Sequence, residues 1–375
     1  MRKIKIVSVV GARPNFMKIA PLLREFEKRK DILNILVNTG QHYTGYMSDI
    51  FLKDFNIKKH TDLNVGADTP IRQIARVMTR FEKVLIKEKP DAVVVVGDVN
   101  STLACALTAV KLNIKVAHVE AGLRSFDRTM PEEINRVLTD SISDYLFATE
   151  PSALRNLKRE GISGGKVFFV GNIMIDSLIH SISEARKRNI RRKFGLQEKG
   201  YALLTLHRPS NVDDKKQLSK TMDMLGKVKE KVKIVYPIHP RSVKMLKHFK
   251  YWERLNSEKN IIAIKPLGYI DFLSLMMGAK FVITDSGGIQ EETTYLGIPC
   301  FTLRKNTERP VTVTRGTNKI IGHNYGLLLK SINRMPSRPK RKIPALWDGR
   351  TAKRIAVILR KGLKKAIAGR RREGA

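Results

Sequence analysis

Residues 91–102 read DAVVVVGDVNST, and this stretch decides the fold. Its apolar run is continuous rather than alternating, which is typical of a parallel strand covered on both faces. The polar residues after it lead into an apolar segment, 101–111, that favours a helix. A strand followed by a helix, repeated along a chain, predicts a doubly wound α/β fold.

The same alternation extends in both directions from this stretch. The helix candidates that flank it cover 14–29, 69–87 and 131–142, and Asp68-Thr69-Pro70 is a favourable helix start. The remaining strand-like runs of the first half lie at 4–11, 32–40, 115–122, 144–150 and 166–172. After a charged stretch, 184–200, five more runs follow at 201–208, 233–239, 261–267, 281–288 and 299–303.

We therefore predict two Rossmann-like doubly wound α/β domains, because a single core rarely grows beyond about 250–300 residues. The first domain spans residues 1–171 and the second 172–350, with the boundary near Gly171. The terminal segment, 351–375, contains a helix with Lys and Arg opposite one apolar stripe. The simplest expectation is that this helix packs on its own domain. Its stripe consists of Ala352, Ile355, Leu359, Leu363 and Ile367.

The bulk composition indicates a soluble globular protein that works inside the cell. Of the 375 residues, 42% are apolar and 28% charged, and no apolar stretch approaches the roughly 18–20 residues of a membrane span. The N-terminal apolar run is short and interrupted by Lys, which favours a buried strand over a signal peptide. Cys105 and Cys300 both stand in apolar runs, so neither a disulfide framework nor a cysteine metal site is expected. We expect a cytoplasmic protein.

The net charge of +36 points to an anionic substrate or a polyanionic partner. Much of the excess is local, because residues 331–375 hold 15 Lys and Arg against Asp348 and Glu373. Such a surface can bind nucleic acid nonspecifically, or it can be a solvated face. Neither a zinc-finger spacing nor an aromatic RNA-binding signature accompanies it, so nucleic-acid binding is disfavoured as the function.

Polar residues that follow the predicted strands are the candidates for chemistry. Ligands of open parallel sheets bind beyond the carboxyl ends of the strands. The residues at these ends are Arg13, Lys18, Asp98, Glu120, His207, Arg208, His239 and the Ser286-Gly287-Gly288 turn.

Two of these segments suit phosphate. In GARPNFMK (11–18), Arg13 and Lys18 flank a predicted helix start, and in SGGIQEE (286–292) two glycines allow backbone N–H groups to approach an anion. Glu292 lies about one turn further and can accept hydrogen bonds from ribose hydroxyls. The alternatives are solvated cations near a turn and an ordinary glycine-rich turn. The chain has no G-x-G-x-x-G and no Walker A motif, which disfavours nicotinamide chemistry and ATP hydrolysis.

Three acids form the other group. Asp98, Glu120 and Glu132 can converge, since two follow strands and the third opens the helix PEEINRVL. Neighbouring carboxylates shift one another's pKa, so that one holds a proton while another acts as a base. Helix capping by Asp98 and Glu132 is the structural alternative. His207, directly after a strand, suits phosphate contact or proton transfer. Because H-E-x-x-H spacing is absent, we expect no catalytic metal.

Nine strings, in the same order along the chain, together resemble the non-hydrolysing UDP-N-acetylglucosamine 2-epimerases. They are GARPNFMKIAP (11–21), TGQHY (39–43), VVGDVNST (95–102), HVEAGLRS (118–125), PEEINR (131–136), GNIMID (171–176), HRPSN (207–211), TDSGGIQEE (284–292) and LRKNTERP (303–310). The resemblance implies a GT-B-like architecture, in which two Rossmann-like domains face each other across a cleft and the C-terminal helix crosses back to the first domain. It also implies inversion of carbon 2 of UDP-N-acetylglucosamine without a cofactor, through elimination of UDP to 2-acetamidoglucal and re-addition. A homodimer is usual for the family.

The resemblance further assigns roles to residues. Asp98, Glu120 and Glu132 become the acid/base candidates, with His207 beside the diphosphate. Those expected to bind the substrate are Arg13, Lys18, Phe272, Ser286, Gly287, Gly288, Glu292 and Arg309, with Glu292 on the ribose and Phe272 near the uracil. Gln41, Arg208 and His239 fit the region where bacterial members bind a second substrate molecule as activator.

The sequence departs from the family pattern at several positions. Asn15 replaces the usual Glu after Arg-Pro, Tyr43 and Thr44 follow the TGQH string, and Pro209 and Ser210 follow His-Arg. Asn15 is therefore not an acid candidate, and activation by a second substrate is not assured. Two alternatives stay open, a UDP-2,3-diacetamido sugar as substrate and a glycosyltransferase of the same architecture.

Overall fold

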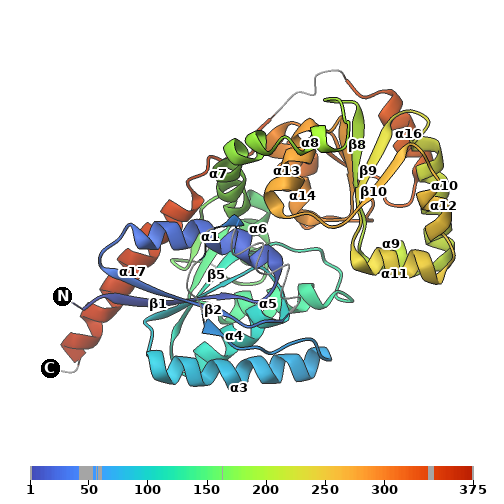
Figure 1. Ribbon diagram of the computed structural model, residues 1–375. Helices are drawn as coiled ribbons and strands as arrows, with labels where there is room; N and C mark the ends of the chain where they lie inside the picture. Colours follow the sequence, from blue (N-terminus) through green and yellow to red (C-terminus); the bar gives the residue numbers. More distant parts are fainter. Residues whose placement is uncertain are drawn as a thin grey trace. The chain divides into compact units, whose positions relative to one another are not determined.

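The computed structural model describes residues 2–41, 54–55, 57, 61–162, 164–336 and 342–373, and it describes only the backbone of Arg13 and of residues 370–373. The chain divides into two compact units, one formed by Met1–Ser177 with Ala345–Ala375 and the other by Leu178–Pro344. Each unit is built around one parallel sheet with helices packed against it (Figure 1). The predicted fold class, two Rossmann-like doubly wound α/β folds, is confirmed.

The sheet of the first unit has the strand order β3-β2-β1-β4-β5-β6-β7, and all neighbours are parallel. Its direction of winding reverses between β1 and β4. In chain order the strands are β1 (Ile4–Val10), β2 (Ile32–Asn38), β3 (Thr61–Asp62), β4 (Ala92–Val96), β5 (Lys115–Ala121), β6 (Tyr145–Ala148) and β7 (Val167–Phe169). The helices are α1 (Arg13–Glu27), α3 (Pro70–Glu88), α4 (Asn100–Lys111), α5 (Pro131–Ile142), α6 (Pro151–Arg159), α17 (Thr351–Glu373) and α7 (Ile173–Arg188), which spans the boundary.

The valine run of residues 92–96 forms β4 at the centre of this sheet. All five of its residues are buried, because successive side chains point to opposite faces and both faces are covered. Val94 and Val96 pack with Phe16 on the α1 face. Val93 and Val95 pack with Phe81 on the α3 face. Two cores on one sheet explain why the run lacks alternation.

Helix α3 begins as predicted, although without the expected side-chain cap. Thr69 occupies the N-cap and Pro70 the first helical position, but the Thr69 hydroxyl makes no capping hydrogen bond. The fixed φ of proline favours a helix start at this point. The helix ends where Lys89 adopts a left-handed conformation.

Helix α17 belongs to the first unit and packs against α1. Ala352, Ile355, Leu359 and Leu363 of its apolar stripe are buried in the core beneath α1. Asp176, in the first turn of α7, accepts hydrogen bonds from the backbone N–H groups of Thr351 (3.2 Å) and Ala352 (2.8 Å). Within the described ranges, no helix combines the length and apolarity that a membrane span needs.

The sheet of the second unit has the order β10-β9-β8-β11-β12-β13, again all parallel, and its winding reverses between β8 and β11. The strands are β8 (Tyr201–Thr205), β9 (Lys233–Pro237), β10 (Ile261–Ile264), β11 (Phe281–Thr284), β12 (Cys300–Thr302) and β13 (Asn318–Ile320). The helices are α8 (Ile190–Lys193), α9 (Pro209–Val212), α10 (Lys215–Val228), α11 (Pro240–His248), α12 (Trp252–Asn256), α13 (Tyr269–Gly278), α14 (Gly287–Leu296), α15 (Pro310–Thr314) and α16 (Tyr325–Asn333).

Candidate active site

The acids of the first unit lie at the carboxyl ends of neighbouring strands, where the winding of the sheet reverses. Asp98 follows β4, and Glu120 lies near the end of β5. Gly97, directly before Asp98, has a left-handed conformation (φ +71°). A Cβ added to Gly97 would lie 3.1 Å from Lys18 Nζ and 3.8 Å from Glu120 Oε2. Glycine therefore lets the β4 end, Lys18 and Glu120 pack closely together.

Glu120 is held in an unusual conformation. Its φ is +71°, and the register between β5 and β6 shifts at this point, as in a β-bulge. A bulge re-aims a side chain relative to the regular strand. The carboxylate is fully buried and accepts a hydrogen bond from Lys18 Nζ (2.5 Å). The Lys18 side chain is also nearly buried. A left-handed non-glycine residue costs free energy, and such residues cluster at functional sites.

Asp98 is not the N-cap of the helix that follows it, because Val99 holds that position in α4. The Asp98 carboxylate forms an ion pair with the buried guanidinium of Arg136 on α5. Glu132 lies in the first turn of α5, half exposed, one helical turn before Arg136. Residues four apart share a helix face, so Glu132 lies on the side of α5 that contacts Asp98.

The loop after β1 is closed by Asn15. Its Oδ1 accepts hydrogen bonds from the N–H groups of Gly11 (3.1 Å) and Ala12 (2.9 Å), and its Nδ2 donates to the carbonyl of Val96 (3.1 Å). Asn15 thus joins the ends of β1 and β4, a role that needs both a donor and an acceptor. The side chain of Arg13, predicted to contact phosphate, lies outside the described part of the chain.

In the second unit, His207 and Asp285 meet across the strands where the winding reverses. His207 Nδ1 lies 2.9 Å from Asp285 Oδ1. Asp285 Oδ2 accepts from the N–H groups of His207 (3.0 Å) and Arg208 (2.9 Å) and from Asn211 Nδ2 (3.0 Å). Burial alone would raise the pKa of Asp285, but these hydrogen bonds outweigh it and the pKa lies below its ordinary value. An ionised carboxylate can thus fix the orientation of the imidazole.

The Ser286-Gly287-Gly288 turn starts α14 and lies against Arg309. A Cβ on Gly287 would come within 2.6 Å of Arg309 Nη1, so a larger residue at this position would require the guanidinium to move. Arg309 Nε is also 2.6 Å from Glu291 Oε1 on α14. A cation beside the N-terminus of a helix forms a favourable setting for an anion.

Glu292 is buried deeper on α14, where Tyr269 Oη donates a hydrogen bond to its Oε1 (2.8 Å). Burial raises the pKa of Glu292 to about 8, and burial likewise raises the pKa of Tyr269. Phe272 lies three residues after Tyr269 on α13, partly exposed. Glu292, Tyr269 and Phe272 therefore lie in one region of the second unit.

The three residues predicted for an activator divide between the units. Arg208 follows β8, and His239 is the N-cap of α11 after β9, with its ring 5.5 Å from that of His207. Gln41 belongs to the first unit, where its Oε1 accepts hydrogen bonds from the N–H (3.0 Å) and hydroxyl (2.8 Å) of Ser101. Its side chain is thus already engaged at the start of α4. His42 and Tyr43–Thr44 of the neighbouring string lie outside the described residues.

Sequence reasoning missed the partners of these residues. Asp285 directly follows β11, which ends at Thr284, so the strand-end argument that found His207 could also have found it with a shorter strand. Arg136 and Tyr269 lie within helices, and their contacts depend on how each helix is rotated against its sheet. No local signal in the sequence gives that rotation.

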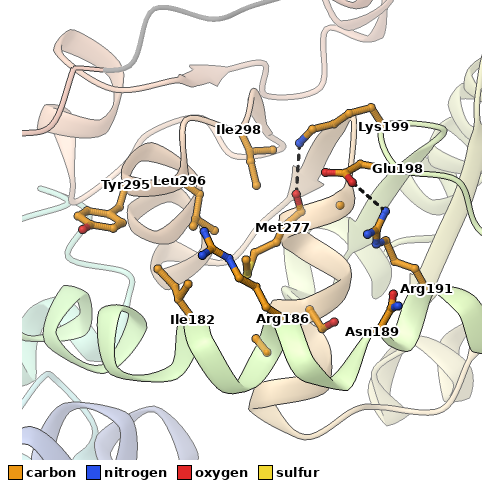
Figure 2. Close-up of a pocket in the computed structure, with 13 residues that line it drawn as sticks. Ile182, Arg186, Asn189, Arg191, Glu198, Lys199, Met277, Tyr295, Leu296 and Ile298 are labelled. Atoms are coloured by element: carbon orange, nitrogen blue, oxygen red, sulfur yellow. Dashed lines mark hydrogen bonds and ion pairs between the residues drawn. The ribbon is translucent and has the colours of Figure 1, made fainter.

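A cavity of about 600 Å³ lies elsewhere in the second unit (Figure 2). Lys199, Gly278 and Ile298, which line it, come just before β8, β11 and β12, so the cavity is at the amino ends of the strands. Two of its cations are engaged by the protein. Lys199 Nζ donates to the carbonyls of Met277 (3.2 Å) and Ala279 (3.0 Å). Arg191 pairs with Glu198 at 3.4 Å. None of the predicted site residues lines this cavity.

Among the described residues, no cluster of three or more His, Cys, Asp or Glu side chains is arranged to hold a metal ion.

Comparisons with known proteins agree with the strings noted in the sequence. A family model described as UDP-N-acetylglucosamine 2-epimerase matches residues 24–360. The UDP-N-acetylglucosamine 2-epimerase of Methanocaldococcus jannaschii is 44% identical over 365 residues, which cover 96% of this chain and 100% of the relative. A UDP-2,3-diacetamido-2,3-dideoxy-D-glucuronate 2-epimerase of Pseudomonas aeruginosa is 37% identical, covering 96% and 100%. A crystal structure of the M. jannaschii enzyme with UDP-GlcNAc and UDP superposes with a TM-score of 0.89 at 45% identity, covering 96% and 100%.

Proposed function

The chain belongs to the UDP-N-acetylglucosamine 2-epimerase family, and we propose that it interconverts UDP-N-acetylglucosamine and UDP-N-acetylmannosamine. The observation that carries the proposal is the pairing of two sets of residues in one chain. Acids stand at the strand ends of one parallel sheet, and a His-Asp pair with a glycine-rich helix start stands at the strand ends of the other. Whole-length identity of 44% to an enzyme of that name supports the same substrate.

The chemistry explains why several acids are needed. The proton on carbon 2 is not next to a carbonyl, so simple deprotonation is very unfavourable. In the proposed reaction a base removes this proton while the bond between carbon 1 and the diphosphate oxygen breaks, which gives 2-acetamidoglucal and UDP. Re-addition forms the same bond again and delivers a proton to the opposite face. Proton-transfer groups are then required on both faces, together with groups that stabilise the departing diphosphate.

We assign the roles accordingly. Asp98, Glu120 and Glu132 transfer the protons, with Lys18 compensating the buried charge of Glu120. His207, oriented by Asp285, assists departure of the diphosphate. The remaining ligands are Arg13, Ser286, Gly287, Gly288 and Arg309 for phosphate or the nearby sugar, Glu292 for ribose and Phe272 for uracil. We also propose that the two sheet units act as an acid/base domain and a UDP-binding domain.

Solvent exchange tests the reaction itself. Purified protein in heavy water should incorporate deuterium at carbon 2 of UDP-N-acetylglucosamine, followed by NMR, without net hydrolysis. A glycosyltransferase of this fold would show no such exchange. Absence of exchange on every UDP-N-acetylhexosamine tried would refute the epimerase proposal.

Single substitutions test the catalytic assignment. Asp98→Asn, Glu120→Gln and Glu132→Gln should each lower turnover by about 100-fold or more, because a positioned acid or base contributes about 10²–10⁴-fold. UDP affinity, measured by calorimetry, should change little, since none of these three acids is a proposed UDP ligand and most of those ligands lie in the second unit. Near-normal rates in all three variants would show that other groups move the protons.

A UDP-2,3-diacetamido sugar is the second candidate substrate. It is favoured by the 37% identity to the P. aeruginosa enzyme that is named for such a substrate. Comparing kcat/KM for UDP-N-acetylglucosamine with that for the diacetamido sugar and its uronate decides between them.

We further propose a homodimer in the cytoplasm. Helix α5 exposes Ile134 (43%), Val137 (36%) and Leu138 (45%), which share one face of the helix and would be covered by a second copy. Sedimentation should give twice the 42.6 kDa mass of one chain, and Leu138→Glu should shift the measured mass toward that of the monomer.

The buried free thiols of Cys105 and Cys300 support a reducing compartment.

A further inference from the structure

A buried hydrogen-bond network lies behind the acids of the first unit. His118, on β5, has its Nδ1 2.7 Å from Asp140 Oδ1 on α5 and its Nε2 2.8 Å from the carbonyl oxygen of Gly97. Both side chains are completely buried, so neither can contact a substrate. Their function must be exerted through the groups that they bind.

The network continues through the second oxygen of Asp140. It accepts a hydrogen bond from the N–H of Gly122 (2.9 Å) and lies 2.7 Å from Arg124 Nη2. Arg124 in turn donates twice to Glu160, the C-cap residue of α6, at 2.7 and 2.6 Å. Burial alone would raise the pKa of Asp140, but His118 and Arg124 outweigh it and the pKa is lowered. Asp140 therefore acts as a carboxylate.

The groups bound by this network flank the acids along the chain. Gly97 directly precedes Asp98, while His118 and Gly122 stand two residues before and two after Glu120. Gly97, Glu120 and Gly122 all have left-handed backbones, with φ of +71°, +71° and +79°. Such a conformation is unfavourable for Glu120 and persists only where its surroundings enforce it. The network also anchors α5, which carries Glu132 in its first turn.

The ring of His118 bridges two parts of the fold. Its Nδ1 contacts Asp140 on α5, and its Nε2 contacts the carbonyl oxygen of Gly97 at the end of β4. A hydrogen bond to a carboxylate is stronger than one between neutral groups. The ring thus joins the ends of β4 and β5 to α5 through a single rigid group.

We propose that His118 and Asp140 are positioning residues that hold Asp98 and Glu120 in their reactive arrangement. The inference rests on the proposed epimerisation, in which these two carboxylates transfer protons. Misplacement of a reacting group by about 1 Å can cost about 100-fold in rate without loss of binding.

The test compares kcat with KM in Asp140→Asn and His118→Gln. Each variant should lower kcat by about 10- to 100-fold while KM and the Kd for UDP stay within about threefold. Their double variant should be about as slow as the slower single one, because the two residues act as a unit. Asp144→Asn is the matched control. Asp144 accepts from Val116 N–H (2.9 Å) and from Lys115 (2.7 Å) at the other end of β5, and its kcat should stay near that of the wild type.

Folded variants with unchanged kcat would overturn the proposal, and so would a parallel loss of kcat and of UDP binding, which indicates general disruption. Wild-type protein that is inactive on every UDP-sugar would instead refute the proposed function. In that case a crystal structure of Asp140→Asn decides the inference. Displaced Asp98 and Glu120 carboxylates support positioning, and unmoved ones refute it.

One measurement needs no variant and applies even if the variants fail to fold. In wild-type protein with ¹⁵N-labelled histidine, NMR should show both ring nitrogens of His118 in hydrogen bonds, one to Asp140 and one to Gly97. A ring that lacks either bond would rule out the bridge between Gly97 and Asp140.

Discussion

At the scale of single residues, Lys18 and Glu120 form a deeply buried ion pair. Their side chains are 9% and 0% exposed, with 2.5 Å between Nζ and Oε2. Taking two charges out of water is costly, and only their close approach and further hydrogen bonds offset the cost. Such a pair contributes little net stability while both members are present, and its disruption leaves a buried charge uncompensated.

Lys18→Met should therefore destabilise the first unit by about 3–5 kcal/mol, because the Glu120 carboxylate stays buried without this cation. The matched control is Lys28→Met at the C-cap of the same helix, where the ion pair with Glu25 (2.6 Å) is exposed on the lysine side. An exposed pair contributes at most about 1 kcal/mol. Urea unfolding curves measure both variants, and equal shifts in their midpoints would contradict the argument.

Glu292 should make the free energy of unfolding depend on pH. Its pKa is about 8 in the folded protein against an ordinary value of 4.5. Between these values the folded state keeps a proton that the unfolded state releases, so the free energy of unfolding falls as pH rises through that window. The slope from one such group is at most about 1.4 kcal/mol per pH unit.

Glu292→Gln should remove this contribution. The difference in free energy of unfolding, variant minus wild type, should therefore be larger at pH 8 than at pH 5. Urea unfolding at both pH values measures it. Glu253→Gln on the exposed side of α12 is the control for a change of charge alone. If Glu292→Gln shows the same dependence of the free energy of unfolding on pH as the wild type, other groups cause that dependence.

At the scale of elements, the strand ends were predictable and their partners were not. A parallel strand covered on both faces must be a continuous apolar run, so β1, β4, β5, β8 and β11 are visible in the sequence. The residue after each run is then a site candidate, which gave Asp98, His207 and Ser286. The strands β3 and β13 were missed because β3 has only two residues, both polar, and the three of β13 (NKI) do not form an apolar run.

The contacts between helix and sheet explain the remaining misses. Arg136 and Asp140 are buried polar residues on α5, and the sequence alone does not say which face of α5 turns inward. The left-handed backbone of Glu120 is equally hidden, because glutamate has no preference for it. These features depend on tertiary packing, which local patterns do not encode.

Helix α17 offers a test of packing at this scale. Leu359 is completely buried with α1 residues in the first core, whereas Val357 on the same helix is 50% exposed. Leu359→Ala should cost about 2–5 kcal/mol through lost burial and the cavity left behind. Val357→Ala should stay within about 0.5 kcal/mol. Equal effects in thermal unfolding would mean that α17 is not part of this core.

At the scale of the whole molecule, the charge of +36 has to be reconciled with a small anionic substrate. A positive field raises the local concentration of an anion and its rate of association. A basic polymer-binding surface would draw on the same charge but would bind long polyanions instead. The two uses differ in how turnover responds to salt and to a competing polymer.

We expect kcat/KM for the UDP-sugar to fall as salt rises from about 0.01 to 1 M, where the Debye length shrinks from about 30 to 3 Å. KM should rise, on the order of tenfold, while kcat at saturation changes little. Salt screens the long-range attraction that guides the substrate to the site more than it screens interactions within the site. Duplex DNA added near physiological salt should leave turnover unchanged. If kcat/KM does not change with salt while DNA strongly inhibits turnover, the excess charge binds a polyanion rather than attracting the substrate.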